Sequence, residues 1–400
     1  MNGMKILVLN CGSSSIKYKL FEMDTCEVLT QGGVEKIGLP DSFLQIKCSN
    51  GEKVIIEKSM PEHTVGIQLI LDSLVDEKVG CIKSLEEIQA VGHRVVHGGE
   101  KFSQSVLITP EIKEMIVKCS DLAPLHNPAN LTGIEAIETI LPGLPQVAVF
   151  DTAFHQTMPD YAYMYALPYE MYDKYAIRRY GFHGTSHRYV SARVCEFLKM
   201  PVAGTRIVTA HIGNGGSCCA VYDGHSIDTS MGLTPVEGLM MGTRCGDLDA
   251  GAATYIMEKE HLTPAEFSAV INKKSGLLGV SGVSSDARDI SAAIKNGNKK
   301  AELARQMFIY RIRKYIGAYA AAMNGLDVLV FTGGIGENDT YIREQICKGL
   351  TYLGVDVDYE LASQVHGEEK MISTAQSKIK VCVIPTDEEI MIAKDTVALL

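Results

Sequence analysis

Two stretches of this chain repeat one pattern, and the repeat limits the possible folds more than any other feature. Residues 5–22 read KILVLNCGSSSIKYKLFE, and residues 206–223 read RIVTAHIGNGGSCCAVYD. Each has a basic residue, an apolar run typical of a buried strand, a tip of Gly, Ser and Asn, a second strand and an acidic residue. The offset of 201 positions is close to half of the 400 residues, so we expect two halves that share one plan.

The tips of both predicted hairpins have the composition of phosphate-binding loops. Glycine and serine leave backbone N–H groups and hydroxyls accessible, and Lys17 follows the first tip. One such hairpin alone is more often an ordinary surface turn. Two of them facing each other would hold a nucleotide between two lobes.

The composition predicts a soluble globular protein that does not bind nucleic acid. Hydrophobic residues make up 46% of the chain and charged residues 22%. The net charge of −10 argues against a nucleic-acid backbone as partner. A length of 400 residues favours two or three domains.

The cysteine pattern and the lack of long apolar runs predict a cytoplasmic protein with no membrane partner. The eleven cysteines form no C-x-x-C pair and show no regular spacing, which is typical of reduced thiols. No apolar stretch approaches the ~18 residues that a membrane span needs. The apolar run after Met4 is too short for a signal peptide.

A third glycine-rich segment, Thr332 to Asn338 (TGGIGEN), follows an apolar strand predicted for 328–331 and precedes a predicted helix. In this context glycine brings the backbone close to a nucleotide, and helix N–H groups face it. The segment matches neither G-x-G-x-x-G nor the Walker A sequence, which disfavours dinucleotide binding and P-loop chemistry. An ordinary strand–helix turn remains an equal alternative.

Several other segments carry predicted elements. Residues 128–141 are predicted as a helix with Asn127 as N-cap, and residues 301–323 as the longest helix. The apolar positions of the long helix lie at spacings of three, four and six: Leu303, Met307, Tyr310, Ile316 and Tyr319. Residues 228–251 read as a long loop, and loops of that length are often functional. Asp151 ends an apolar strand predicted for 146–150, a usual place for a site in α/β folds.

Cationic residues cluster near predicted strand or loop ends, among them Arg94, His183 and Arg244. His183 and His187 are four residues apart, which could indicate zinc. The glutamate of H-E-x-x-H is missing, however, and Gly184 argues against a helix there. An imidazole that donates to a phosphoryl oxygen is the favoured interpretation. Any single arginine, by contrast, is more often a surface ion pair.

Seven blocks of this chain resemble the signature blocks of acetate kinases. They are NCGSSSIK, GHRVVHGGE, FDTAFHQTMP, RRYGFHGTSH, HIGNGGS, DTSMGLTPVEGLMMGTR and FTGGIGEN, and they occur in the family's order. The resemblance implies the acetate and sugar kinase, Hsc70 and actin superfamily: an α/β fold with a duplicated ribonuclease-H-like (actin-like ATPase) unit and a nucleotide cleft between two lobes. We expect residues 1–150 and 386–400 in one lobe and residues 151–385, with the nucleotide site, in the other.

The resemblance also implies roles for residues at matching positions. Mg²⁺, which Mn²⁺ could replace, would be placed mostly through water by Asn10 and Glu388. The catalytic residues would be Arg94, Asp151, His183 and Arg244. Acetate would meet Arg94, Val96, Leu125, Phe182 and Pro235. ATP would contact Lys17, His211, Ile212, Gly213, Asn214, Gly215, Asp286, Ala287, Arg288, Gly334, Ile335, Gly336, Glu337 and Asn338.

The implied reaction is reversible, Mg²⁺-dependent phosphoryl transfer from ATP to acetate, giving acetyl phosphate and ADP by direct in-line attack. A homodimer is expected. Two alternatives stay open: a propionate kinase of the same family, and an actin- or Hsc70-like ATPase module. The chain departs from the family pattern at Cys245, Ala250 and Asp387, where serine, proline and asparagine are usual. Asp387 adds a carboxylate near the proposed metal ligand.

Overall fold

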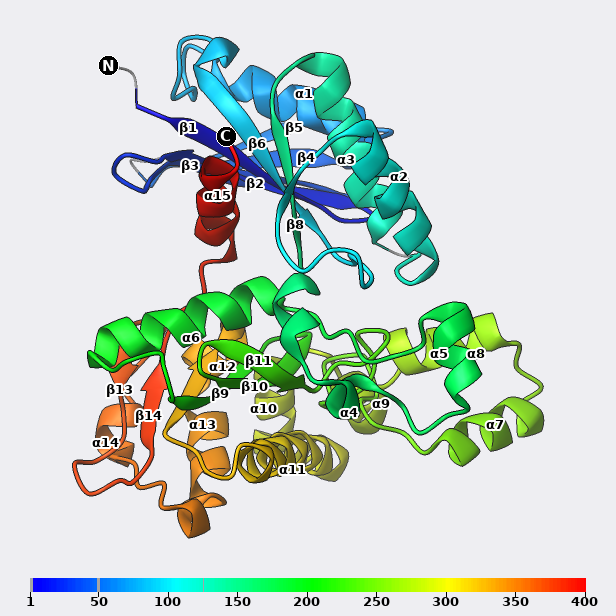
Figure 1. The fold of residues 1–400 in the computed structure, drawn as a ribbon, viewed down its shortest axis with the longest axis vertical. Coiled ribbons are helices and arrows are strands. Elements are labelled where there is room, and N and C mark those ends of the chain that lie inside the picture. The colour runs from blue at the N-terminus through cyan, green and yellow to red at the C-terminus, as the bar shows by residue number, and fades with distance from the viewer. Residues whose placement is uncertain (1–2, 49–50, 125) are drawn as a thin grey trace. The chain divides into compact units, whose positions relative to one another are not determined.

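The computed structural model describes residues 3–48, 51–124 and 126–400, which form two compact units (Figure 1). The first unit extends to Ala153 and includes Asp387–Leu400. The second unit comprises Phe154–Thr386. The sequence had placed these two boundaries after residues 150 and 385.

The first unit is built on an eight-stranded mixed sheet with the order β5-β4-β3-β2-β1-β6-β8-β7. Its strands are β1 (Lys5–Cys11), β2 (Ser15–Glu22), β3 (Glu27–Glu35), β4 (Phe43–Cys48), β5 (Lys53–Glu57), β6 (Ile88–Val95), β7 (Val106–Leu107) and β8 (Gln146–Phe150). Strand β1 pairs antiparallel with β2 and parallel with β6, and β6 is parallel to β8. The carboxyl ends of β1, β6 and β8 therefore lie at one edge of the sheet.

Helices cover both faces of this sheet (Figure 1). They are α1 (His63–Leu74), α2 (Pro110–Lys118), α3 (Asn127–Ile140) and α15 (Glu388–Ala398). Leu7 and Leu9 of β1 share a core with Ile67 of α1 and Ile137 of α3. On the other side, α15 contacts β1, β6 and β8. Gly92 permits this approach, because a Cβ there would lie 2.6 Å from Cγ2 of Ile392.

The predicted N-cap of α3 is wrong. The helix begins at Asn127, and His126 is the residue before it. The Asn127 carboxamide accepts a hydrogen bond from the N–H of His97 and donates one to its carbonyl. The Asn127 side chain therefore makes a tertiary contact instead of the helix cap that the local sequence predicted.

The second unit has a six-stranded sheet with the order β11-β10-β9-β12-β14-β13. Its strands are β9 (Arg206–Ile212), β10 (Gly216–Tyr222), β11 (His225–Thr229), β12 (Val328–Thr332), β13 (Lys370–Met371) and β14 (Lys380–Val383). Strand β9 pairs antiparallel with β10 and parallel with β12, which is parallel to β14. The series β11-β10-β9-β12-β14 thus repeats the series β3-β2-β1-β6-β8. The expected fold class is confirmed.

The repeat differs from the ungapped alignment at the hairpin tips. In the first hairpin Cys11 pairs with Ile16, whereas in the second Ile212 pairs with Gly216. The second tip is one residue shorter, so the equivalence of the return strands shifts by one position.

Helices also cover both faces of the second sheet (Figure 1). The helices of the second unit are α4 (Asp160–Tyr163), α5 (Tyr169–Tyr175), α6 (Gly184–Leu198), α7 (Ala250–Lys259), α8 (Pro264–Lys273), α9 (Gly276–Ser281), α10 (Ala287–Lys295), α11 (Lys299–Ala322), α12 (Gly333–Asn338), α13 (Thr340–Lys348) and α14 (Tyr359–Ala362). Of these, α5, α7 and α8 lie beside the sheet (Figure 1). Val190 and Val194 of α6 pack against one face, on Ile207 of β9. Helix α11 packs against the other face.

The apolar positions of α11 are only partly buried. Leu303, Met307 and Tyr310 are exposed, whereas Phe308 and Ile312 are buried. Residues 316 and 319 are buried. The long helix has apolar residues on more than one side, so apolar spacing alone did not decide which side meets the sheet.

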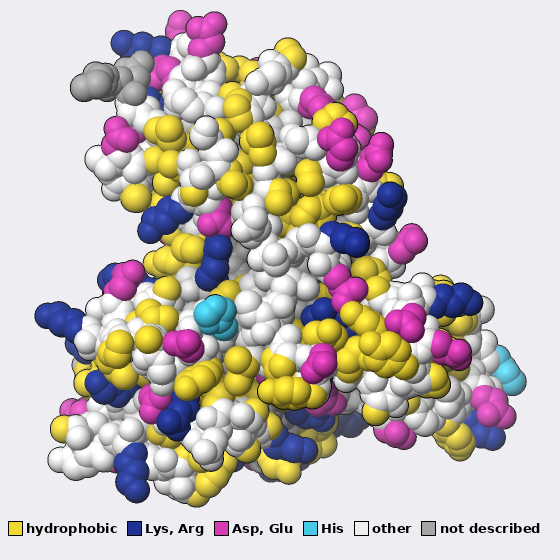
Figure 2. All heavy atoms as spheres, viewed as in Figure 1, with side chains coloured by type: hydrophobic (Ala, Val, Ile, Leu, Met, Phe, Trp, Pro, Cys, Tyr) yellow, Lys and Arg dark blue, Asp and Glu magenta, His cyan; other side chains and the backbone are white. Residues whose placement is uncertain are grey.

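All eleven cysteines are free. Within the described residues, no helix is both long and apolar enough to cross a membrane. Acidic and basic side chains are interspersed over the face shown in Figure 2.

Candidate active site

Three polar side chains of the first unit meet where β1, β6 and β8 end. Asn10 is the penultimate residue of β1, Arg94 is the penultimate residue of β6, and Asp151 directly follows β8. Arg94 donates from Nε to both Asp151 carboxylate oxygens, at 2.9 and 3.1 Å, and from Nη2 to Oδ2 at 2.6 Å. Nη1 donates to Oδ1 of Asn10 at 3.4 Å. The parallel strands thus bring a cation, an acid and an amide together.

Glu388, the first residue of α15, adds a second acid to this cluster. Its carboxyl group is partly buried, and burial raises its pKa to about 7. The charges of Asp151 and Glu389 raise the pKa further, while Arg94 and Lys17 act against them. Lys17 is exposed on β2, directly across the hairpin from Asn10.

Asp387, one of the departures from the family pattern, caps α15. Its Oδ1 accepts a hydrogen bond from the N–H of Ile390 and lies 3.4 Å from Nζ of Lys19. Lys19 also reaches Glu389 at 3.2 Å. The extra carboxylate is therefore engaged by the helix start and by a lysine on β2. At the other departures, the Cys245 thiol donates to the carbonyl of Gly246, and Ala250 begins α7.

The residues around Asn10 and Glu388 fit a magnesium ion. Mg²⁺ usually takes one or two carboxylates and fills its remaining positions with water and phosphate oxygens. Besides burial, the charges of Asp151 and Glu389 raise the pKa of Glu388. A divalent cation would offset this repulsion between the carboxylates. No group of three or more His, Cys, Asp or Glu side chains suited to a metal occurs in the part of the chain described.

Val96 lies just beyond β6 and is buried. Its N–H donates to Oδ1 of Asn130 in α3, and Nδ2 of Asn130 donates to the carbonyl of Cys11. Through Asn130, helix α3 therefore fixes the backbone at Val96, two residues after Arg94. Leu125, the other expected apolar contact from this unit, lies outside the described residues.

In the second unit, His183, Arg244 and the tip of the β9–β10 hairpin come together. A Cβ built on Gly215 would lie 3.3 Å from Nη1 of Arg244 and 3.8 Å from Nε2 of His183. Nη1 of Arg244 also donates to the carbonyl of Pro235 at 3.4 Å. The ring of His211, near the end of β9, stacks on His183 with centroids 4.4 Å apart. Because Gly215 has no side chain, space remains beside Nη1 of Arg244 and Nε2 of His183.

His183 has a left-handed backbone, with φ of 55°, at the N-terminus of α6. Such a conformation in a residue other than glycine is uncommon and often marks a functional position. The helix starts at Gly184 and includes His187, so the argument that Gly184 excludes a helix was wrong. Phe182 is buried beside it, and its carbonyl lies 3.0 Å from Nε2 of His155.

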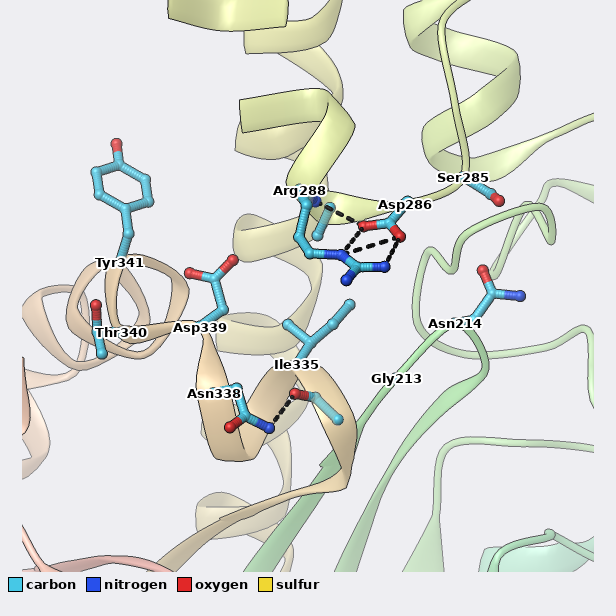
Figure 3. Close-up of a pocket in the computed structure, with 12 residues that line it drawn as sticks. Gly213, Asn214, Ser285, Asp286, Arg288, Ile335, Asn338, Asp339, Thr340 and Tyr341 are labelled. Atoms are coloured by element: carbon cyan, nitrogen blue, oxygen red, sulfur yellow. Dashed lines mark hydrogen bonds and ion pairs between the residues drawn. The ribbon is translucent and has the colours of Figure 1, made fainter. Parts of the chain in front are cut away.

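A pocket of about 670 Å³ opens beside this hairpin (Figure 3). Its walls come from the hairpin tip, the start of α10 and the α12–α13 segment. They comprise Gly213, Asn214, Ser285, Asp286, Ala287, Arg288, Gly334, Ile335, Asn338, Asp339, Thr340 and Tyr341. The volume and the mix of backbone, apolar and charged groups suit a nucleoside-sized ligand.

Asp286 and Arg288 form an ion pair at this pocket, with Oδ2 2.6 Å from Nη2 (Figure 3). Hydrogen bonds from Arg288 and its backbone lower the pKa of Asp286 to about 2. Sequence reasoning missed Ser285, Asp339, Thr340 and Tyr341 as wall residues. The one sequence signal for these four residues was that they directly adjoin the expected segments 286–288 and 334–338. Which neighbours line a pocket depends on how the segments pack.

Of the other expected nucleotide contacts, His211, Ile212, Gly215, Gly336 and Glu337 do not line this pocket. The Glu337 carboxylate instead accepts hydrogen bonds from the N–H groups of Gly333 and Thr386, at 2.9 and 3.1 Å. The segment expected to be a loop before a helix is itself the short helix α12. Gly333, at φ of 77°, is needed there because a Cβ would lie 2.9 Å from the carbonyl of Ile212.

A duplicated ribonuclease-H-like fold that carries a nucleoside-sized pocket belongs to the class of actin-like phosphotransferases. Within that class the chain belongs to the acetokinase family, whose sequence profile matches residues 5–394. The family predicted from the signature blocks is thereby confirmed.

Individual relatives match over nearly their whole length. The acetate kinase of Bacteroides thetaiotaomicron is 64% identical over 397 residues, which cover 99% of this chain and 100% of the relative. That of Phocaeicola vulgatus is 65% identical over the same shares. The crystal structure of Porphyromonas gingivalis acetate kinase has 61% identity and a TM-score of 0.95, over 99% of this chain and 100% of that one. A propionate kinase from Francisella tularensis has 44% identity and a TM-score of 0.93 over the same shares.

Proposed function

We propose that this protein catalyses reversible phosphoryl transfer between ATP and acetate, giving acetyl phosphate and ADP. The observation that carries the proposal is the identity of 61–65% to acetate kinases over essentially the whole chain. The cluster of Arg94, Asp151 and Asn10, and the position of His183 and Arg244 beside Gly215, supply groups that this chemistry requires.

Acetate needs no general base, because it is already ionised near neutral pH. The difficulty is repulsion between this anion and the triphosphate, and it is met by cations placed around the transferred group. In the proposal Arg94 orients the carboxylate. Arg244 and His183 donate to oxygens of the phosphoryl group as it transfers, and the carboxylate attacks it in line.

Asp151 acts in this scheme by holding Arg94. Both of its oxygens accept hydrogen bonds from that guanidinium, and the residue is almost fully buried. A carboxylate whose two oxygens both accept from a guanidinium is placed to fix the orientation of that guanidinium. We therefore assign Asp151 to orientation rather than to proton transfer from acetate.

Asn10 and Glu388 would hold Mg²⁺, mostly through water, with Mn²⁺ as a substitute. When bound, the ion would offset the negative charge of the ATP phosphates. Lys17 and the tip residues of the second hairpin would bind the phosphates, and the pocket beside that hairpin would bind the nucleoside. Asp286, Arg288 and Asn338 are the side chains there with hydrogen-bonding capacity.

Two other functions make different predictions for one assay. Hydroxylamine traps acyl phosphates, so the protein should form acetyl hydroxamate from acetate, ATP and Mg²⁺. Preferential trapping of propionyl hydroxamate would favour the propionate kinase, to which the 44% identity also points. ATP hydrolysis without any hydroxamate would favour an ATPase module and contradict the proposal.

We also propose a homodimer in a reducing cytoplasm. The family resemblance supports the dimer, and eleven free thiols are usual in a reducing compartment. Sedimentation equilibrium tests the dimer, which a single species of 43.6 kDa at micromolar concentration would contradict.

A further inference from the structure

His183 is joined to the interior of the second unit by a chain of hydrogen bonds. Its Nδ1 lies 2.9 Å from the hydroxyl of Ser217, on β10. The same hydroxyl lies 2.7 Å from Nε2 of His187, on α6. Nδ1 of His187 lies 2.7 Å from the hydroxyl of Thr209, on β9. A serine therefore bridges two histidines, and a threonine ends the chain.

The inner members of this chain are fully buried. Ser217, His187 and Thr209 are all 0% exposed. Burial, with smaller contributions from His155 and His211, lowers the pKa of His187 well below its ordinary value. His187 is therefore neutral and has one ring nitrogen that donates and one that accepts.

Because each hydroxyl has a single proton, the chain can be ordered in only two ways. In the outward order, Thr209 donates to Nδ1 of His187, Nε2 of His187 donates to Ser217, and Ser217 donates to Nδ1 of His183. In the inward order all three bonds reverse. The proton of Thr209 then needs another acceptor, and among the described residues His187 is its one hydrogen-bond partner.

The outward order is therefore favoured, because buried donors are rarely left without an acceptor. It makes Nδ1 of His183 an acceptor, so the proton of the neutral imidazole lies on Nε2. That nitrogen faces the hairpin tip, 3.8 Å from the position a Cβ would take on Gly215.

We propose that Ser217, supported by His187 and Thr209, is a positioning residue that orients the His183 ring and fixes its proton on Nε2. A neutral His183 then presents an N–H donor to a phosphoryl oxygen without first becoming a cation. Ser217 and His187 themselves touch no substrate in this scheme. The inference rests on the proposed role of His183, but the location of its proton can be measured without turnover.

The direct test is ¹⁵N NMR of histidine-labelled full-length protein at a pH where His183 is neutral, with its signals assigned through His183→Gln. The wild-type protein should show a protonated Nε2 and a bare Nδ1. Ser217→Ala should lose this preference and lower kcat by about 10–100-fold, the scale for supporting hydrogen bonds. The KM for ATP should change less than kcat, because the nucleoside pocket does not include Ser217.

Paired variants at Thr209 give a second test that does not depend on the folding of the Ser217 variant. Thr209→Val removes the hydroxyl at nearly constant volume and should loosen the proton order, whereas Thr209→Ser should retain it. Ser191→Ala is the control, because among the described residues this buried hydroxyl of α6 has a single hydrogen-bond acceptor, the carbonyl of Arg188. It should change neither the His183 signals nor kcat.

Two results would overturn the proposal. One is a wild-type His183 whose neutral form carries its proton on Nδ1. The other is unchanged His183 signals and kcat in both Ser217→Ala and Thr209→Val. Either can occur in a protein that still forms acetyl hydroxamate, whereas failure of the hydroxamate assay leaves the NMR result intact. The positioning role and the proposed reaction can therefore fail separately.

Discussion

Asp151 holds Arg94 through both of its carboxylate oxygens, each of which accepts a hydrogen bond from the guanidinium. The carboxylate is 1% exposed, while the arginine side chain is 26% exposed. A buried acid thus fixes the orientation of a cation that still reaches the surface. The planar fork of arginine suits this arrangement, and the single ammonium group of lysine cannot reproduce it.

Arg94→Lys should therefore be nearly as harmful as Arg94→Ala. We expect each to lower kcat by about 10²–10³, the scale for loss of one preorganised electrostatic donor. Asp151→Asn should lower kcat in the same range, because the amide cannot accept at both positions. Steady-state kinetics with acetate and MgATP, together with far-UV circular dichroism to confirm folding, would measure these effects.

A matched control for this exchange exists on α6. Arg193 also forms a two-point ion pair, with Glu369, at 2.6 and 2.8 Å, but on the surface. Arg193→Lys should leave kcat unchanged. Near-normal kcat in Arg94→Lys would contradict the orienting role of the fork.

Gly215 should be needed for the position of Arg244. A methyl group there would contact Nη1 of Arg244 at 3.3 Å, closer than most side chains allow. We expect Gly215→Ala to lower kcat by roughly tenfold and Arg244→Ala by about 10²–10³. If the glycine acts through the arginine, the double variant should be no slower than Arg244→Ala alone. Additive losses would instead indicate that Gly215 acts independently.

Buried His93 should make stability depend on pH. Burial lowers its pKa from 6.5 to about 4, although a hydrogen bond with Gln146 partly opposes the shift. Between these values the unfolded chain binds a proton that the folded protein does not. Stability therefore rises with pH through this window and is lost as pH falls from 6.5 to 4, by about 3 kcal/mol at most.

Urea denaturation of the wild type and of His93→Gln across this pH range would measure the effect. The variant should lose the part of the slope that His93 contributes, whatever its absolute stability, whereas buried His187, whose pKa is also lowered, keeps its own contribution. His225→Gln, at an exposed position, should keep the wild-type slope. An equal slope in all three proteins would show that other groups cause the pH dependence.

The sequence predicted the plan of the fold because strand patterns and turn residues are local signals. The two hairpins, the parallel strands after them and the position of Asp151 all follow from short apolar runs and their ends. Details that depend on tertiary packing were not predictable in this way. Asn127 was expected to cap α3, but its carboxamide bonds His97, which is distant in sequence.

The same limit applies to the candidate sites. The signature blocks located Arg94, Asp151 and the hairpin tips, since these residues are set by strand ends. The wall formed by Asp339 and Tyr341, and the inward turn of Glu337 toward Thr386, depend on how α12 packs on the second sheet. No spacing in the sequence distinguishes a glutamate that lines a pocket from one that accepts hydrogen bonds from the backbone behind it.

Val96 should influence which carboxylic acid is used. It is 7% exposed, and its backbone is fixed by Asn130, so its side chain cannot easily move aside for a larger substrate. Propionate has one methylene more than acetate, worth ~0.8 kcal/mol if it is buried and unfavourable if it clashes. Since apolar pockets distinguish single methylenes by only about 10–200-fold, propionate should be a poor but measurable substrate.

Val96→Ala would remove two methyl groups and open space for that methylene. We expect a modest loss of kcat/KM for acetate, because apolar contact is lost, and a higher ratio of propionate to acetate turnover. Steady-state kinetics on both acids for the two proteins would measure the ratio, and Val54→Ala, on strand β5 away from the cluster of Arg94, serves as a control. A ratio that stays constant or falls in Val96→Ala would remove Val96 from the acid-binding pocket, and would leave the preference for acetate to residues contributed by other segments.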